Sequence, residues 1–417
     1  MFNELFNVSD ELCALDEKIM KKCAPYFERV DAKRDFNQLK VLKAFTDNKV
    51  GAQHLVGSTG YGYGDIGRDT LDRVFADAVG AEDALCRAAF MSGTHALTVA
   101  LFGILRTGDL LLAATGTPYD TLASVIGKEG ESYGSLKEFG VRYDEIPLVE
   151  GQPNFAEIEK RAKAAKLVHI QRSRGYGDRE AFSVEKIGEI VAAVRRGNPK
   201  AVVMVDNCYG EFTEKTEPIA VGADLIVGSL IKNAGGGIAE TGGYIAGKRD
   251  FVELCAHRLT APGTGREIGS FPSGLRQLYL GLYLAPSITA EAIKSGIYAS
   301  AIFESEGFST SPKANEQRSD IITTIELKNK ANLVKFCGAI QGASPVDSFA
   351  APEAWEMPGY EDKIIMAAGA FTCGSSIELS CDAPMREPYR VYLQGGISLA
   401  SSRYAFLRAV GDMRKQK

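Results

Sequence analysis

Short apolar runs alternate with stretches of helical periodicity between residues 57 and 284, and this pattern constrains the possible folds more than any other feature. Each run has the length of a buried strand, and the segments between the runs are long enough for helices. Chains with this alternation form a mainly parallel sheet covered by helices. The pattern therefore predicts an α/β fold with strands at 84–90, 110–114, 166–170, 201–205, 225–227 and 243–246.

A chain of 417 residues is too long for one simple core, so we expect more than one domain. Two amphipathic helical stretches, 9–30 and 35–49, predict a helical arm over residues 1–56. The alternating pattern predicts a large domain over residues 57–285. We expect residues 286–417 to form a smaller α/β domain, with strands at 321–327 and 375–380 and helices at 331–341 and 397–413.

The composition favours a small-molecule ligand. The chain has 48 basic and 53 acidic residues, a net charge of -5 and no long run of one sign, which argues against nucleic acid or an anionic membrane as partner. The eight cysteines never form a Cys-x-x-Cys pair, and no segment has about 18 consecutive apolar residues. We therefore expect a cytoplasmic protein with reduced cysteines, and no residue spacing predicts a metal site.

Two residues that suit a cofactor follow predicted strands. Asp206 comes directly after the strand at 201–205, and Lys232 lies 232 minus 206, or 26, positions later, beyond the strand at 225–227. Ligands of open parallel sheets bind at the carboxyl ends of the strands. Pyridoxal 5'-phosphate (PLP) needs a lysine amine for a Schiff base and a carboxylate beside its pyridine nitrogen. The pair predicts a PLP site, although either residue alone could be a surface lysine or a helix-capping aspartate.

A phosphate site is expected upstream, at Ser92, Gly93 and Thr94. These residues lie between a predicted strand and a helix, which directs backbone N–H groups and hydroxyls toward an anion. The same residues could form an ordinary helix cap. Their order before the aspartate and the lysine favours the phosphate role, and Ser229 is expected to be an additional phosphate donor.

Tyr119 follows the strand at 110–114, so it is expected at another carboxyl end. There it could stack on the cofactor ring and offer its phenol to a substrate, or it could be a turn tyrosine that caps the core. His95 is the alternative stacking residue, but its place in a first helical turn is more typical of a packed or exposed histidine.

Residues 62–67 match the Gly-x-Gly-x-x-Gly pattern of dinucleotide-binding sites. The preceding segment, 53–59, does not have the composition of a buried strand, which that site requires. We therefore reject a nicotinamide site here.

The motifs above resemble, in order and spacing, the cystathionine and methionine lyases among the fold-type I PLP enzymes. Longer segments resemble the methionine γ-lyase-like branch, whose members are often labelled aluminium resistance proteins. These segments are Gly-Tyr-Gly-Tyr-Gly-Asp-Ile-Gly-Arg-Asp-Thr-Leu at 60–71, Gln-Arg-Ser-Arg-Gly-Tyr at 171–176 and Gly-Ser-Ser-Ile-Glu-Leu-Ser at 374–380. The resemblance covers nearly the whole chain from Gly51 onward and implies the fold-type I architecture.

The resemblance also implies a homotetramer, a dimer of dimers, in which Tyr63 of one subunit reaches the cofactor phosphate of its neighbour. Tyr119 would then be the stacking phenol. The better-studied lyases have an arginine two residues after the first tyrosine, where this chain has Asp65, so Arg68 is expected to bind phosphate instead. They also have a threonine where Ile231 stands.

The arginine that binds the substrate carboxylate in those lyases has no direct counterpart, because the nearest motif here carries Glu378. A buried carboxylate favours a bidentate guanidinium partner. Arg386 and Arg390, with Arg172 or Arg174, are the candidates, although each could be a surface or structural arginine.

The resemblance implies a PLP-dependent carbon–sulfur lyase of the cystathionine β-lyase or methionine γ-lyase type. Lys232 would take the Cα proton of a sulfur-containing amino acid, and Tyr119 would protonate the leaving thiolate. The products would be a thiol, a 2-keto acid and ammonia. Transamination, aldol cleavage or replacement by the same groups remain alternatives, as does a PLP-binding protein without turnover.

Overall fold

The computed structural model describes residues 1–128, 133–356 and 362–415. The contacts divide the chain into two compact units. The larger unit comprises residues 36–285, and the smaller comprises residues 1–35 together with 286–417. The three domains expected from the sequence stay a prediction. The two helical stretches expected in the first fifty residues are instead one helix, α2 (Asp10–Asp47).

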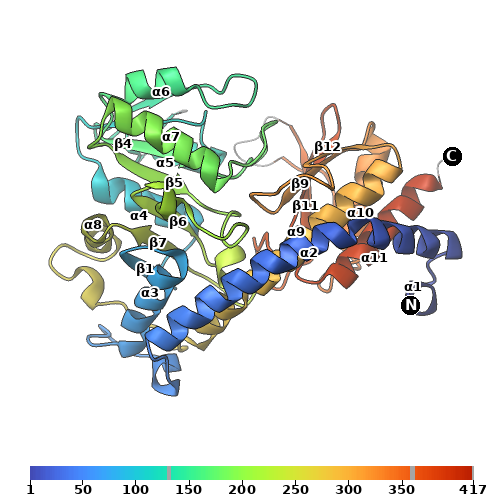
Figure 1. The fold of residues 1–417 in the computed structure, drawn as a ribbon, viewed down its shortest axis with the longest axis horizontal. Helices are drawn as coiled ribbons and strands as arrows, with labels where there is room; N and C mark the ends of the chain where they lie inside the picture. The colour runs from blue at the N-terminus through green and yellow to red at the C-terminus, as the bar shows by residue number, and fades with distance from the viewer. Residues whose placement is uncertain (129–132, 357–361, 416–417) are drawn as a thin grey trace. The chain divides into compact units, whose positions relative to one another are not determined.

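The larger unit contains a seven-stranded sheet with the order β1-β7-β6-β5-β4-β2-β3 (Figure 1). The pairs between neighbours from β6 to β3 are parallel, whereas β7 is antiparallel to both of its neighbours. The mainly parallel sheet predicted from the alternating pattern is therefore confirmed. Its strands are β1 (Asp83–Arg87), β2 (Leu110–Ala113), β3 (Arg142–Glu145), β4 (Leu167–Gln171), β5 (Val202–Asp206), β6 (Leu225–Ser229) and β7 (Gly243–Gly247), of which β3 was not predicted.

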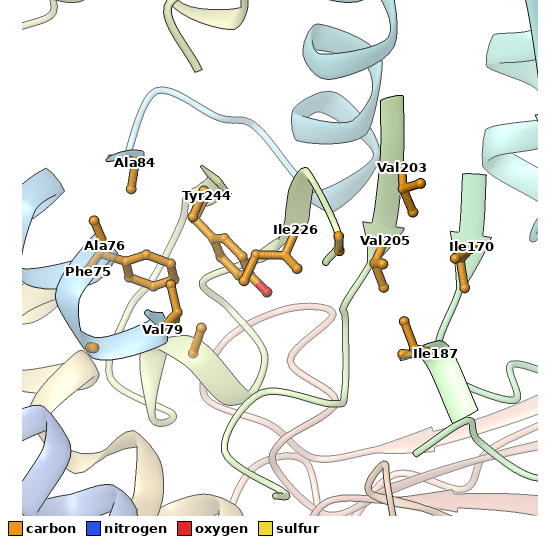
Figure 2. Packing of buried hydrophobic residues seen from close by; sticks show 14 of the residues in the cluster. Phe75, Ala76, Val79, Ala84, Ile170, Ile187, Val203, Val205, Ile226 and Tyr244 are labelled. Atoms are coloured by element: carbon orange, nitrogen blue, oxygen red, sulfur yellow. The ribbon is translucent and has the colours of Figure 1, made fainter. Parts of the chain in front are cut away.

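Helices cover both faces of this sheet, which explains why its strands are continuous apolar runs. On one face, α3, α6 and α7 pack against side chains such as Ile170, Val203 and Ile226 (Figure 2). On the other face, α4, α5 and α8 pack against the alternate residues of the same strands, such as Met204. The helices are α3 (Ile66–Val79), α4 (Gly93–Ile104), α5 (Asp120–Ile126), α6 (Phe155–Ala162), α7 (Val184–Gly197) and α8 (Arg249–Leu259).

The smaller unit contains a five-stranded sheet, β10-β11-β12-β9-β8, in which every pair is antiparallel. The part of helix α2 before residue 36 belongs to this unit, where Asp16 forms a buried ion pair with Arg403 and accepts a hydrogen bond from Tyr298 at 2.7 Å. The elements are α1 (Phe2–Phe6), β8 (Ser309–Ser311), β9 (Ile322–Glu326), β10 (Ile364–Ala368), β11 (Ser380–Pro384), β12 (Arg390–Gln394), α10 (Lys330–Gly342) and α11 (Leu399–Arg414). Helix α9 (Arg276–Ser305), like α2, contributes residues to both units.

The strand expected at 375–380 was wrong, because β11 begins only at Ser380. The segment before it is a loop. The buried carboxylate of Glu378 holds this loop, because it accepts hydrogen bonds from the backbone N–H groups of Phe371 and Thr372 at 2.9 and 3.1 Å. These bonds replace a strand ladder. The expected strand at 321–327 and the helices at 331–341 and 397–413 correspond to β9, α10 and α11.

In the described part of the chain, no helix has the length and apolar character needed to cross a membrane. The segment before Gly62 contains the short 3-10 helix η1 (Ala52–Leu55) rather than a buried strand, which agrees with the rejection of the dinucleotide pattern.

Candidate functional site

The carboxyl edge of the large sheet brings together residues that are distant in the sequence. Asp206 is the last residue of β5 and Ser229 is the last residue of β6. The two strands are parallel neighbours, so both residues lie on one edge. Lys232 lies three residues after the end of β6, where a tight turn that contains glycine begins. This is the edge at which ligands bind in open α/β sheets.

Asp206 is a buried carboxyl group at the end of β5. Its Oδ1 accepts the backbone N–H of Cys208 at 3.1 Å. Burial raises the pKa of Asp206 to about 6, although the hydrogen bonds from Cys208 and the charge of Lys232 oppose the rise. A protonated ring nitrogen beside this carboxyl group would favour its ionised form, so the residue suits the pyridinium of PLP.

Lys232 is held by the phenol of Tyr209. Its Nζ donates a hydrogen bond to the hydroxyl of Tyr209 at 2.8 Å and lies 4.2 Å from the centre of that ring. Burial by itself lowers the pKa of Lys232, but the interactions with Tyr209, Cys208 and Asp206 together outweigh burial and leave the pKa raised. The amine is therefore positioned by the segment that directly follows Asp206.

A candidate anion site lies where helix α4 begins. Ser92 caps the helix by accepting the backbone N–H of His95 at 3.1 Å. A Cβ atom added to Gly93 would lie 3.2 Å from the Cβ of Ser229, so the helix start and the end of β6 are in close contact. The hydroxyl of Ser229 is buried and has no hydrogen-bond partner among the described residues. A phosphate at the helix N-terminus would satisfy this group.

Tyr119 is connected to the anion site. Its hydroxyl and the Oγ1 of Thr94 share a hydrogen bond of 2.9 Å, and its backbone N–H donates to Gln171 at 3.0 Å. Burial raises the pKa of Tyr119, and Asp206 adds to the rise, so the phenol is protonated at neutral pH and can donate a proton. His95 instead accepts the backbone N–H of Met91 at 3.0 Å, which is the behaviour of a packed helix residue.

Tyr63 and Arg68 are held in a different turn. The side chain of Tyr63 is 65% exposed, and its ring lies 5.5 Å from that of Tyr61. Arg68 is buried, donates to the carbonyl of Gly62 at 2.9 Å and pairs with Asp69. Arg68 thus braces the turn that presents Tyr63, and the phosphate roles of both residues stay predictions.

The candidate substrate arginines differ in their surroundings. Arg174 is only 3% exposed and follows β4 by three residues, and the last residue of β4, Gln171, is opposite Asp206 in the sheet. Arg386 and Arg390 belong to the smaller unit, where they pair with Asp362 at 3.1 Å and Glu326 at 2.6 Å. All three assignments stay predictions.

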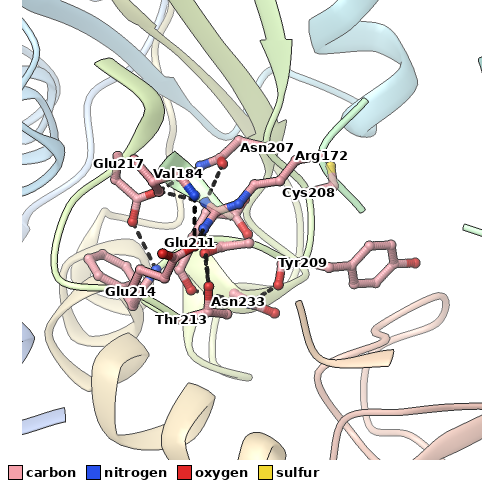
Figure 3. Close-up of polar contacts among 12 residues, drawn as sticks. Arg172, Val184, Asn207, Cys208, Tyr209, Glu211, Thr213, Glu214, Glu217 and Asn233 are labelled. Carbon is pink, nitrogen blue, oxygen red and sulfur yellow. Dashed lines mark hydrogen bonds and ion pairs between the residues drawn. The ribbon is translucent and has the colours of Figure 1, made fainter. Parts of the chain in front are cut away.

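Sequence reasoning missed a buried polar network beneath the segment 207–217 (Figure 3). At its centre, Arg172 is fully buried and bonds Asn207 at 2.8 Å, Glu217 at 3.2 Å and Glu214 at 2.9 Å. This assigns Arg172 a structural role. Nearby, burial raises the pKa of Glu211 to about 8, so this carboxyl group is neutral at pH 7.

Tyr209 was also missed, although it lies only three residues after Asp206. Its backbone φ is 72°, a left-handed conformation that is uncommon for bulky residues. No sequence pattern signals such a turn at a tyrosine. The only available clue was its place in the segment Val-Asp-Asn-Cys-Tyr, which ends a predicted strand.

Comparisons with known proteins agree with this geometry. The family model of methionine γ-lyase matches residues 12–414. The Bacillus subtilis protein YnbB is 44% identical over 388 residues, which are 91% of each chain. A solved structure from Clostridium novyi, named a carbon-sulfur lyase involved in aluminium resistance, is 49% identical with a TM-score of 0.94. That match covers 99% of this chain and 98% of the other.

More distant structures show the fold alone. The PLP-dependent protein YhfS from Escherichia coli has a TM-score of 0.63 at 14% identity, and the match covers 92% of this chain and 97% of the other. The fold is therefore that of fold-type I PLP enzymes, as the sequence predicted. Because the family model covers nearly the whole described chain, the chain belongs to the methionine γ-lyase family.

Proposed function

We propose that this protein is a PLP-dependent carbon–sulfur lyase that acts on a sulfur-containing amino acid by elimination and releases a thiol, a 2-keto acid and ammonia. The observation that carries the proposal is the arrangement of Asp206, Lys232 and an anion site on one sheet edge. Membership of the methionine γ-lyase family and the lyase name of the Clostridium novyi relative support it.

The residues of this edge match the three parts of PLP. The backbone at Ser92 to Thr94 and the unpartnered hydroxyl of Ser229 would hold the phosphate. Asp206 would face the ring nitrogen, and Lys232 would bond the aldehyde carbon. A bound PLP would supply an electron sink for the charge that develops at the substrate Cα.

The protein groups supply the proton transfers. With substrate bound, the amine of Lys232 would act as the base that removes the Cα proton. Tyr119 is protonated at neutral pH, as its raised pKa requires, and donates its proton to the departing sulfur. Of the three candidate arginines for the substrate carboxylate, Arg174 is favoured because it lies in the same unit as Lys232.

An absorption spectrum before and after borohydride, with mass mapping of the reduced protein, tests the cofactor assignment. We expect a yellow protein in which borohydride fixes PLP onto Lys232. Product analysis with cysteine, cystathionine and methionine then tests the reaction. Keto acid and ammonia without a thiol, or transfer of the amino group, would contradict carbon–sulfur elimination. Absence of any absorption band after added PLP would overturn the cofactor assignment.

We also propose a homotetramer in which Tyr63 of one subunit contacts the phosphate held by its neighbour. The exposure of Tyr63 and the bracing of its turn by Arg68 support this role. Sedimentation velocity tests the assembly. Tyr63→Phe should weaken PLP binding without changing the sedimentation coefficient, whereas unchanged PLP affinity would contradict the role.

A further inference from the structure

The contacts of Lys232 point to an additional residue in its chemistry. This inference rests on the proposed function, in which the lysine amine is alternately bonded to the cofactor and free. A free amine on a long side chain loses its orientation unless a partner holds it, and correct orientation is a large part of catalysis.

Tyr209 provides that partner in two ways. Its hydroxyl accepts a hydrogen bond from Nζ at 2.8 Å, and its ring face lies 4.2 Å from the same atom. Cys208 and Asp206 are two further titratable groups of the described chain that act on the amine. Cys208 is held protonated by burial, and Asp206 is expected to be occupied by the cofactor ring. The phenol oxygen of Tyr209 is therefore the acceptor that holds the amine in place.

The backbone of Tyr209 is fixed in an unusual conformation. Its φ of 72° is left-handed, and bulky residues keep such a conformation only where the surroundings enforce it. Asn233, the neighbour of Lys232 in the sequence, donates its side-chain amide to the carbonyl of Tyr209 at 2.9 Å and to that of Glu211 at 3.2 Å. The turn and the lysine are thus joined by adjacent residues.

The buried network supports the same turn from below. The backbone N–H of Gly210 donates to the carbonyl of Asn207 at 2.9 Å, which closes the turn. A Cβ atom at Gly210 would lie 2.5 Å from the side chain of Arg172, so only glycine lets the arginine pack there. Arg172 in turn bonds the side chain of Asn207 at 2.8 Å (Figure 3).

We propose that Tyr209 is the residue that receives and orients the free amine of Lys232, both before the cofactor binds and after the substrate has displaced the lysine. The network of Arg172 and Asn233 holds Tyr209 in its left-handed turn so that the phenol meets the amine. The hydrogen bond runs from the amine to the phenol oxygen.

Competitive labelling of the full-length protein tests this proposal without relying on turnover. Trace acetic anhydride is applied across a pH series after hydroxylamine has removed any bound PLP, and mass mapping follows each lysine. In Tyr209→Phe the ring remains but the acceptor is lost, so the labelling midpoint of Lys232 should fall by about one pH unit. Lys186 of α7, which is half-buried and pairs with Glu189, is the internal reference and should not change.

Tyr119→Phe is the matched comparison, because it removes a phenol that bonds Thr94 rather than the lysine. An unchanged Lys232 midpoint in Tyr209→Phe, or a larger shift in Tyr119→Phe, overturns the proposal. If Tyr209→Phe does not fold, Asn233→Ala is the second variant, because it releases the turn that holds Tyr209. The labelling midpoint of Lys232 should then also fall. An unchanged midpoint in Asn233→Ala would overturn the proposal.

Two further readouts separate this inference from the proposed function. A wild-type protein that forms no PLP absorption band would contradict the proposed function, whereas the labelling result would still decide the contact with Tyr209. In the active enzyme, Tyr209→Phe should lower kcat about 10- to 100-fold with little change in KM, since the base is misplaced while the substrate contacts remain.

Discussion

The two sheets of this protein distribute their polar residues in different ways. In the larger unit, β2, β4, β5 and β6 are parallel, so the residues after each strand gather on one edge. In the smaller unit every strand pair is antiparallel, and consecutive strands end on opposite edges. There Arg390 opens β12 directly opposite Glu326 at the end of β9, and the two form an ion pair.

Because of this difference, the sequence can predict a site at the edge of the parallel sheet but not in the antiparallel sheet. A polar residue after a parallel strand is placed by the topology at a common site, as Asp206 and Ser229 are. A polar residue at the end of an antiparallel strand meets whichever residue pairs with it, so the roles of Arg386 and Arg390 cannot be inferred from position in a strand.

The largest expected effect is at the parallel edge. Lys232→Ala should lower turnover by about 10⁴-fold or more, because the Schiff base and the general base are lost together. Steady-state kinetics measures this loss. Lys248→Ala is the control, since that lysine is 55% exposed and pairs with Asp224 away from the site. Substantial activity in Lys232→Ala would refute the assignment.

The second-largest expected effect is a loss of stability when Arg172, the buried support of this edge, is replaced. Arg172→Met leaves Glu217 and Asn207 buried without their partner, which should destabilise the protein by about 3–5 kcal/mol. Thermal unfolding measures the change. Arg196→Met is the matched variant, because Arg196 forms an exposed ion pair with Glu159. It should lower the free energy of unfolding by no more than about 1 kcal/mol. Equal costs for the two variants would contradict the structural role of Arg172.

Asp206→Asn should separate the binding of the cofactor from the stability of the chain. The pKa of Asp206 is raised to about 6, so ionisation of this group destabilises the folded state as pH rises from its ordinary value of 3.8 toward 6. Without PLP, the variant should therefore gain up to about 3 kcal/mol over wild type, with the full gain present above pH 6. Its PLP affinity should fall. Thermal unfolding at pH 4, 5, 6 and 8 checks this, and a difference independent of pH would contradict it.

The smallest expected effects are changes in KM, and they show which unit supplies the arginine that binds the substrate carboxylate. Arg174→Gln should raise KM about 10- to 100-fold, since it removes a charged partner of the substrate carboxylate. Arg386→Gln should leave KM nearly unchanged and cost about 0–1 kcal/mol of stability, because Arg386 is 57% exposed and pairs with a surface aspartate. If Arg386→Gln or Arg390→Gln has the larger effect on KM, the antiparallel sheet supplies the substrate contact.

Much of the large sheet was predictable from the sequence because a strand buried on both faces must be apolar along its length. The strands β2, β4, β5, β6 and β7 fall within about two residues of the expected positions. The strand β3 was missed because Arg142 to Glu145 contains three charged residues and lies at the sheet edge, where burial is incomplete. The loop at Glu378 was mistaken for a strand because its pattern cannot show that a carboxylate caps the backbone.

The sequence by itself determined the alternating α/β pattern and the order of Ser92, Tyr119, Asp206 and Lys232, because strand length, burial and position after a strand are local properties. Only the tertiary structure decided that Tyr209 holds the lysine amine and that Arg172 is a buried support. Both depend on side chains far apart in the sequence that meet in a low-dielectric interior, where a polar group remains only if a specific partner satisfies it. No local pattern encodes those partners.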